Sequence, residues 1–140
     1  MSDMPPPPPS PPAQPPMGGS SSAAGSNKNL YTILAWALFP PVGSLIFLFV
    51  GKDDPDVKHN AAAATVIHGG FLVVYIVLII LSAVTVGLLS PLAFIWFVIW
   101  FIAWVVGAIL AFQANGARVS FPVVGTMAEK YVPMVEDWAK

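Results

Sequence analysis

The chain has 140 residues, of which 56% are hydrophobic and only 9% are charged, and its formal net charge is −1. A soluble globular protein has about 25% charged residues, so this composition excludes an ordinary water-soluble fold, and the charge gives no electrostatic case for binding nucleic acid. Cysteine is absent, which excludes disulfides, thiol catalysis and cysteine-held metal sites.

The distribution of charge predicts an all-α integral membrane protein. Between Lys58 and Arg118 there is no acidic or basic residue, and this run has room for two helices of the roughly 20 residues that a crossing needs. A third apolar stretch precedes it. We expect a tail (residues 1–29), a transmembrane domain (30–116) with about three spans (30–50, 67–89 and 92–114), and an interfacial C-terminal segment (117–140).

The N-terminal tail is of low complexity. Nine of the fifteen prolines lie between Pro5 and Pro16, and a Gly/Ala/Ser stretch follows at 18–26. Such segments favour extended or flexible chain and have few apolar side chains to bury, which predicts disorder. A solvated spacer is favoured over a docking peptide for an aromatic-lined groove.

The first apolar span, residues 30–50, has prolines in its middle. Pro40 and Pro41 remove backbone donors and clash with the preceding turn, so a kink or break is expected near Phe39, with Gly43 beside it. Within lipid the freed backbone groups need partners, and Ser44 is one candidate. The span is either a proline-kinked crossing or two half-helices that form a re-entrant element.

The second helix is expected to start at an acidic turn and to end near residue 89. Asp54 suits the N-cap position, Pro55 the first helical residue, and Asp56 the positive end of the helix dipole. These acids could also suggest a cation site, but no calcium-loop spacing follows, and capping is the favoured interpretation. The alanine-rich first turns of this helix are expected at the water boundary or against another helix.

The third span, residues 92–114, contains a stripe of tryptophans. Trp96, Trp100 and Trp104 recur every four residues and therefore lie on one face of a helix. Helix packing or lipid contact is favoured over ligand binding for this stripe.

The C-terminal segment is expected to begin at a helix stop. Gly116 suits the left-handed position after a helix. Thr126 and Glu129 fit a capping box that starts a short amphipathic helix on the membrane surface.

The two histidines and the remaining polar residues predict no active site. His59 and His68 are nine residues apart, half a turn out of phase on one helix, so they cannot hold one metal ion together. A hydrogen-bonded structural role is favoured for His68 over a gate or pH sensor. No nucleophile–base set and no phosphate loop is present, which predicts a protein without enzymatic activity, cofactor or bound metal.

Three spans would place the loop at 51–60 and the C-terminus on one side of the membrane. That side would hold five cationic residues (Lys52, Lys58, Arg118, Lys130 and Lys140), and the other would hold Lys28 alone. The positive-inside rule then predicts a multi-pass protein of the cell membrane with a cytoplasmic C-terminus and an external tail.

Three motifs in order support a family resemblance: Phe39-Pro40-Pro41-Val42-Gly43, Lys58-His59 before four alanines, and Gly116 followed by Phe121-Pro122-Val123-Val124-Gly125. This order resembles the small bacterial and archaeal membrane family that is similar to the chloroplast import component "Tic-twenty". The resemblance covers about residues 29–132. It implies that His59, Pro122 and Gly125 match family positions, and it implies a role in protein import.

These patterns predict a small non-enzymatic membrane protein that acts through helix–helix association as a subunit or scaffold. The alternative, drawn from the resemblance, is a component of a translocation or channel complex. The expected partners are the lipid bilayer and a membrane protein or further copies of the chain, with no nucleic acid. The structural or interaction candidates are Pro40, Pro41, Gly43, His59, His68, Gly116, Pro122 and Gly125.

Overall fold

A computed structural model describes residues 24–140, in which every regular element is a helix, as predicted. The elements are α1 (Ala24–Ala37), α2 (Val42–Val50), α3 (Pro55–Val84), α4 (Ser90–Ala114), α5 (Gly125–Ala128), α6 (Val132–Glu136) and the 3-10 turn η1 (Asp137–Ala139). The proline-rich segment and its predicted disorder lie outside the described residues. Helix α1 begins six residues before the expected boundary at residue 30.

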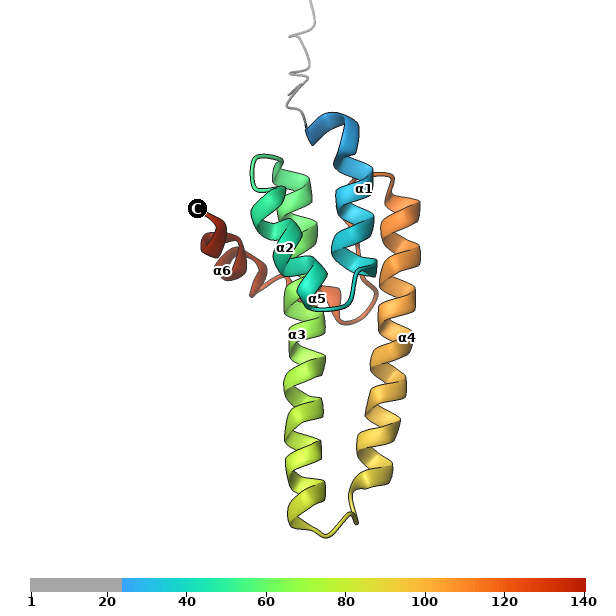
Figure 1. The fold of residues 1–140 in the computed structure, drawn as a ribbon. Coiled ribbons are helices and arrows are strands. Elements are labelled where there is room, and N and C mark those ends of the chain that lie inside the picture. Colours follow the sequence, from blue (N-terminus) through green and yellow to red (C-terminus); the bar gives the residue numbers. More distant parts are fainter. Residues whose placement is uncertain (1–23) are drawn as a thin grey trace, which may run out of the picture.

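Helices α3 and α4 form a long antiparallel hairpin (Figure 1). They have 30 and 25 residues, or about 45 and 37 Å of helix, and both are apolar enough and long enough to cross a membrane. The second helix ends at Val84 rather than near residue 89. The turn that follows is closed by a 2.8 Å hydrogen bond between the hydroxyls of Ser82 and Ser90.

The first apolar span does not form a third crossing helix, and the expectation of three full spans is therefore not met. It is divided into α1, which has 14 residues, and α2, which has nine and is only about 14 Å long. The chain reverses between them, so the start of α1 and the end of α2 both lie beside the start of α3 (Figure 1). Lys28, expected across the membrane from the 51–60 loop, instead bonds Asp56.

The reversal between α1 and α2 is possible because its backbone groups find partners. Pro40 and Pro41 cannot continue the hydrogen-bond ladder of a helix. The amides of Val42 and Gly43 donate to the Phe39 carbonyl, and the Ser44 hydroxyl donates to the Pro41 carbonyl at 2.7 Å. The expectation that Ser44 satisfies a freed group is confirmed.

Glycine at position 43 lets the two short helices approach at this turn. A Cβ added to Gly43 would lie 2.0 Å from the carbonyl oxygen of Leu38, which no real side chain tolerates. Any larger residue here would push α2 away from α1.

The C-terminal segment packs along the first half of α3, and the expected short helix at this end is present. The capping box predicted for it is wrong. Thr126 lies inside α5, where its hydroxyl donates to the Val123 carbonyl, and Glu129 follows the last residue of the helix. Helix α6 buries Val132 and Val135, so part of its apolar surface covers protein.

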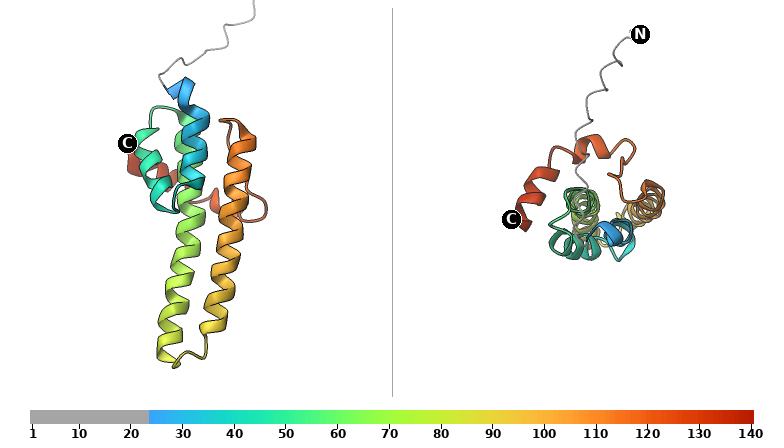
Figure 2. Two further views of the ribbon diagram at one scale, coloured as in Figure 1. Left: turned by 45° about the vertical axis from the view of Figure 1, so that its right-hand side comes forward. Right: turned by 90° about the horizontal axis from the view of Figure 1, so that it is seen from above.

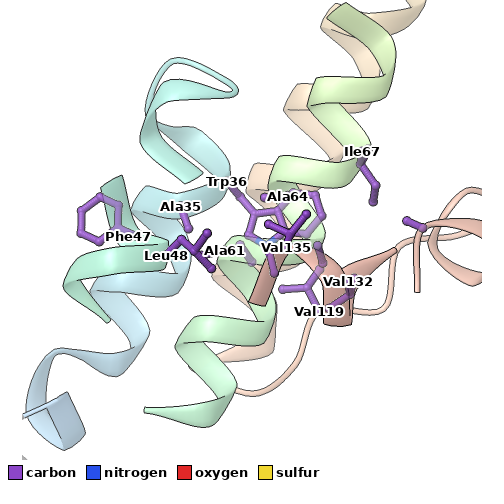
Figure 3. Close-up of a cluster of buried hydrophobic side chains, with 14 of the residues drawn as sticks. Ala35, Trp36, Phe47, Leu48, Ala61, Ala64, Ile67, Val119, Val132 and Val135 are labelled. Carbon is purple, nitrogen blue, oxygen red and sulfur yellow. The ribbon is translucent and has the colours of Figure 1, made fainter. Parts of the chain in front are cut away.

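The buried core lies where all these elements meet, in the half of the molecule that contains the start of α3 (Figure 3). The consecutive alanines 61–64 of α3 are buried and give the neighbouring helices a close approach. Trp36 of α1 fills the space and stacks on Phe121, with ring centroids 5.7 Å apart. Gly107 of α4 makes room for the Trp36 ring, since a Cβ there would lie 2.6 Å from its Cε3 atom.

The tryptophan stripe of α4 serves helix packing, as predicted. The indole nitrogen of Trp96 donates to the Phe71 carbonyl on α3, Trp100 donates to His68, and Trp104 donates to the Ala37 carbonyl at the end of α1. Each indole therefore joins α4 to a neighbouring helix. The Trp104 bond also satisfies one of the carbonyls that a helix leaves unpaired at its C-terminus.

Two glycine substitutions test this packing. Gly107→Ala should lower the free energy of unfolding by about 1–3 kcal/mol, because the new methyl group overlaps Trp36. Gly70→Ala on α3 is the matched control, since a Cβ there meets nothing within 4 Å, and it should be neutral or stabilising by up to about 1 kcal/mol. Thermal unfolding in detergent, followed by circular dichroism, measures both. Equal effects of the two changes would contradict the packing of Trp36 on Gly107.

Candidate functional site

An ionic cluster joins three distant segments at the charged end of the bundle. The Lys28 ammonium of α1 donates to Asp56 of α3 and lies 3.8 Å from Asp54. Arg118, which follows α4, donates from Nε to the other carboxylate oxygen of Asp56 at 3.0 Å. The hydrogen bond to Asp56 raises the pKa of Lys28, so its ammonium stays charged in this contact.

Asp54 forms the N-cap of α3, as predicted. Its carboxylate accepts hydrogen bonds from the amides of Asp56 at 2.9 Å and Val57 at 3.1 Å, and Pro55 follows as the first helical residue. These amides have no partner within the helix, so the cap stabilises its start.

Below the ionic cluster, the side chain of Asn60 is completely buried and joins three elements. Its amide nitrogen donates to Thr32 of α1 at 3.3 Å and to the Ala117 carbonyl at 2.9 Å. Its amide oxygen accepts from the Val119 amide at 2.7 Å. Asn60 thereby holds α1 and the chain after α4 against α3, and a buried amide with satisfied bonds favours this single arrangement.

The two predicted histidines occupy separate places. His59 Nδ1 lies 3.2 Å from a carboxylate oxygen of Glu136, so it links α3 to α6. His68 is completely buried between Trp36 and Trp100, and the Trp100 indole donates to its Nδ1 at 3.2 Å. Within residues 24–140, no group of three His, Asp or Glu side chains could hold a metal ion.

The other predicted residues lie at turns. Pro40 and Pro41 form the α1–α2 turn, and Gly43 is the second residue of α2. Gly116 has a φ of +86° and follows Asn115, which is also left-handed, so α4 ends here as expected. Pro122 lies in the connection between α4 and α5, and Gly125 is the first residue of α5. These residues shape the backbone and do not converge on one cavity.

An apolar groove of about 540 Å³ lies beneath the α1–α2 turn. It is lined by the turn itself and by the facing sides of α3 and α4, with Phe39, Pro41, Leu72, Trp100 and Trp104 among its walls. No charged side chain contributes to it. The groove suits hydrocarbon, and no predicted site residue supplies a polar group to it.

Sequence reasoning missed Asn60 and the contact between Thr65 and Ser44. The Thr65 hydroxyl lies 2.9 Å from that of Ser44 and joins α3 to α2. A signal for Asn60 was present, because it is the last amide before a long apolar run. A polar side chain in such a helix must find partners, but the partners come from segments 28 and 57 to 59 residues away along the chain.

Replacement of Asn60 tests the junction. Asn60→Ala leaves the Val119 amide and the Ala117 carbonyl without their partner and should lower the free energy of unfolding by about 2–4 kcal/mol. The control is Asn29→Ala, which removes the exposed bond to Asn115 and should change stability by about 0.5 kcal/mol or less. Denaturation in detergent micelles measures both. A loss at position 60 no larger than that at position 29 would argue against the junction.

Comparison with known proteins identifies the family. Residues 26–128 match the family model MamF/MmsF, described as the magnetosome magnetite crystal formation protein family. No curated protein and no solved structure matches the chain significantly. The resemblance to the "Tic-twenty"-like family is therefore wrong as an identification, and the import role and the family position of His59 that it implied lose their support. The match covers most of the chain and nearly the whole helical bundle, and the chain belongs to the magnetosome magnetite crystal formation protein family.

Proposed function

We propose that this chain takes part in magnetite crystal formation as a small, non-enzymatic subunit of the magnetosome membrane, which acts by associating with other membrane proteins. The observation that carries the proposal is the family match over residues 26–128. These residues include both long helices and the α1–α2 hairpin, so the bundle as a whole is the unit that the family shares.

The bonds of the polar side chains support a structural role. Lys28 and Arg118 both donate to Asp56, and Asn60 bonds three groups of the surrounding chain. The tryptophans of α4 bond neighbouring helices. Packing thus accounts for these side chains without a reaction.

The open face of α3 supports association. Gly69 and Gly70 lie in the middle of this helix, and a Cβ added to either meets nothing within 4 Å. Small residues on an uncovered helix face permit a second helix to approach closely, which is how membrane helices associate. Another magnetosome membrane protein or a second copy of the chain fits this face.

The distribution of cationic residues supports an orientation in which the charged end of the bundle, with the start of α3 and the C-terminal segment, faces the cytoplasm. All six lysine and arginine residues belong to α1, the start of α3, the loop before it, or the chain after α4. The turn at the opposite end, residues 85–89, has no charge. The positive-inside rule then places the start of α3 and the C-terminus on the cytoplasmic side.

A substitution on the open face tests the function. Gly70→Leu adds bulk where there is free space, so the protein should fold and insert, but helix approach should be blocked. In a magnetosome-forming strain that lacks the gene, this variant should fail to restore normal magnetite crystals and should lose its crosslinked products.

The control for this experiment is Ile79→Leu, a conservative change at an exposed position on the opposite face of the same helix, which should restore both. Normal crystals with Gly70→Leu, together with crosslinking that returns only monomer for the unaltered protein, would reject association as the mechanism.

The orientation has its own test, for which the absence of natural cysteine gives a clean background. Asp53→Cys marks the loop before α3, and Leu88→Cys marks the turn at the opposite end. In isolated, intact magnetosome vesicles, whose outer surface is the cytoplasmic one, an impermeant maleimide should label Asp53→Cys and not Leu88→Cys. The reverse pattern would overturn the proposed orientation.

A further inference from the structure

The two halves of the bundle differ in width. Around the first half of α3 lie α1, α2, α5, α6 and the end of α4 (Figure 2). The other half consists of α3 and α4 alone, and many of its apolar side chains face outward, as at Val73, Ile80 and Phe94, which are 61%, 56% and 68% exposed.

The wide half reaches into one leaflet of a bilayer. A hydrocarbon core of about 30 Å holds about 20 residues of α3, which counted from the uncharged turn at residues 85–89 run back to about residue 65. The α1–α2 hairpin extends past this level, because Trp36 packs against His68 and the turn at Phe39 lines a groove with Leu72. The hairpin therefore enters the hydrocarbon of one leaflet and does not reach the other.

The apolar groove beneath the α1–α2 turn supports this depth. Its walls are apolar and aromatic, its volume is about 540 Å³, and it opens to the outside of the protein below Phe39 and Pro41. In a bilayer only lipid hydrocarbon is available to fill such a space. Lipid thus replaces protein in the leaflet that the hairpin does not reach.

We propose that the protein is a wedge that bends the membrane, making convex the leaflet that the α1–α2 hairpin enters. A packed protein half does not compress, so it displaces more lipid area in one leaflet than the two helices displace in the other. Curvature that expands the leaflet holding the wide half of the protein accommodates the larger displaced area, as it does for helices inserted into one side of a membrane.

The bending goes beyond the proposed role in crystal formation and does not depend on it. With the proposed orientation, the convex leaflet is the cytoplasmic one. That is the outer leaflet of an internal vesicle, so the wedge would favour a small closed compartment. The wedge itself would hold for either orientation, because it follows from the shape of the bundle.

The test measures how each orientation of the protein distributes among vesicles of different diameter. The full chain is reconstituted into neutral phosphatidylcholine vesicles of mixed size, so that attraction of the lysines to anionic lipid does not contribute. An impermeant fluorescent maleimide added from outside labels Asp53→Cys only in molecules whose loop before α3 faces out of the vesicle. It labels Leu88→Cys only in molecules whose turn between α3 and α4 faces out. Fluorescence of single tethered vesicles then gives protein density against diameter.

The two labels should report opposite preferences. The density of labelled Asp53→Cys should rise at least about twofold from the largest to the smallest vesicles, whereas that of labelled Leu88→Cys should fall. Densities independent of diameter for both labels, or the same trend for both, would overturn the proposal. Its failure would leave the complementation experiment with Gly70→Leu unaffected, so the two conclusions are separable.

Discussion

A helix that ends inside a bilayer must satisfy its last backbone groups without water, and the structure depends on how α1 meets this constraint. The prolines after Phe39 prevent a continuous helix. The Trp104 indole and the Ser44 hydroxyl donate to the carbonyls of Ala37 and Pro41, and the turn's own amides bond Phe39. With these groups paired, the chain can reverse after α1, and the hairpin packs beside α3.

The reversal determines where the charged residues meet. Because α1 and α2 return to the start of α3, Lys28 can reach Asp56, and Asn60 can reach Thr32. Arg118 and Val119 arrive at the same place after α4. Within residues 24–140, the contacts of Lys28 and Arg118 with Asp56 are thereby gathered at one end, and the other end is a bare pair of helices. The membrane orientation and the wedge shape proposed above both follow from this asymmetry.

Much of the fold could be predicted from local patterns, because those patterns act over a few residues. The cap at Asp54, the packing role of the tryptophan stripe and the stop near Gly116 are of this kind. The turn at Pro40 was expected, but whether the chain would cross or reverse depends on partners such as Trp104, 67 residues from Ala37 along the chain. Asn60 was missed for the same reason. The family was misidentified because short motifs around prolines and glycines describe turns that membrane proteins of other families also need.

The distance between the start of α1 and the loop before α3 tests the reversal most directly. Spin labels at Asn27→Cys and Asp53→Cys, in protein reconstituted into bilayers, can be measured by pulsed electron paramagnetic resonance. The hairpin predicts a short separation, because neighbouring Lys28 lies within 3.8 Å of Asp54. A first helix that crossed the membrane would instead separate the labels by about 30 Å or more, the thickness of the hydrocarbon core, and that result would contradict the account.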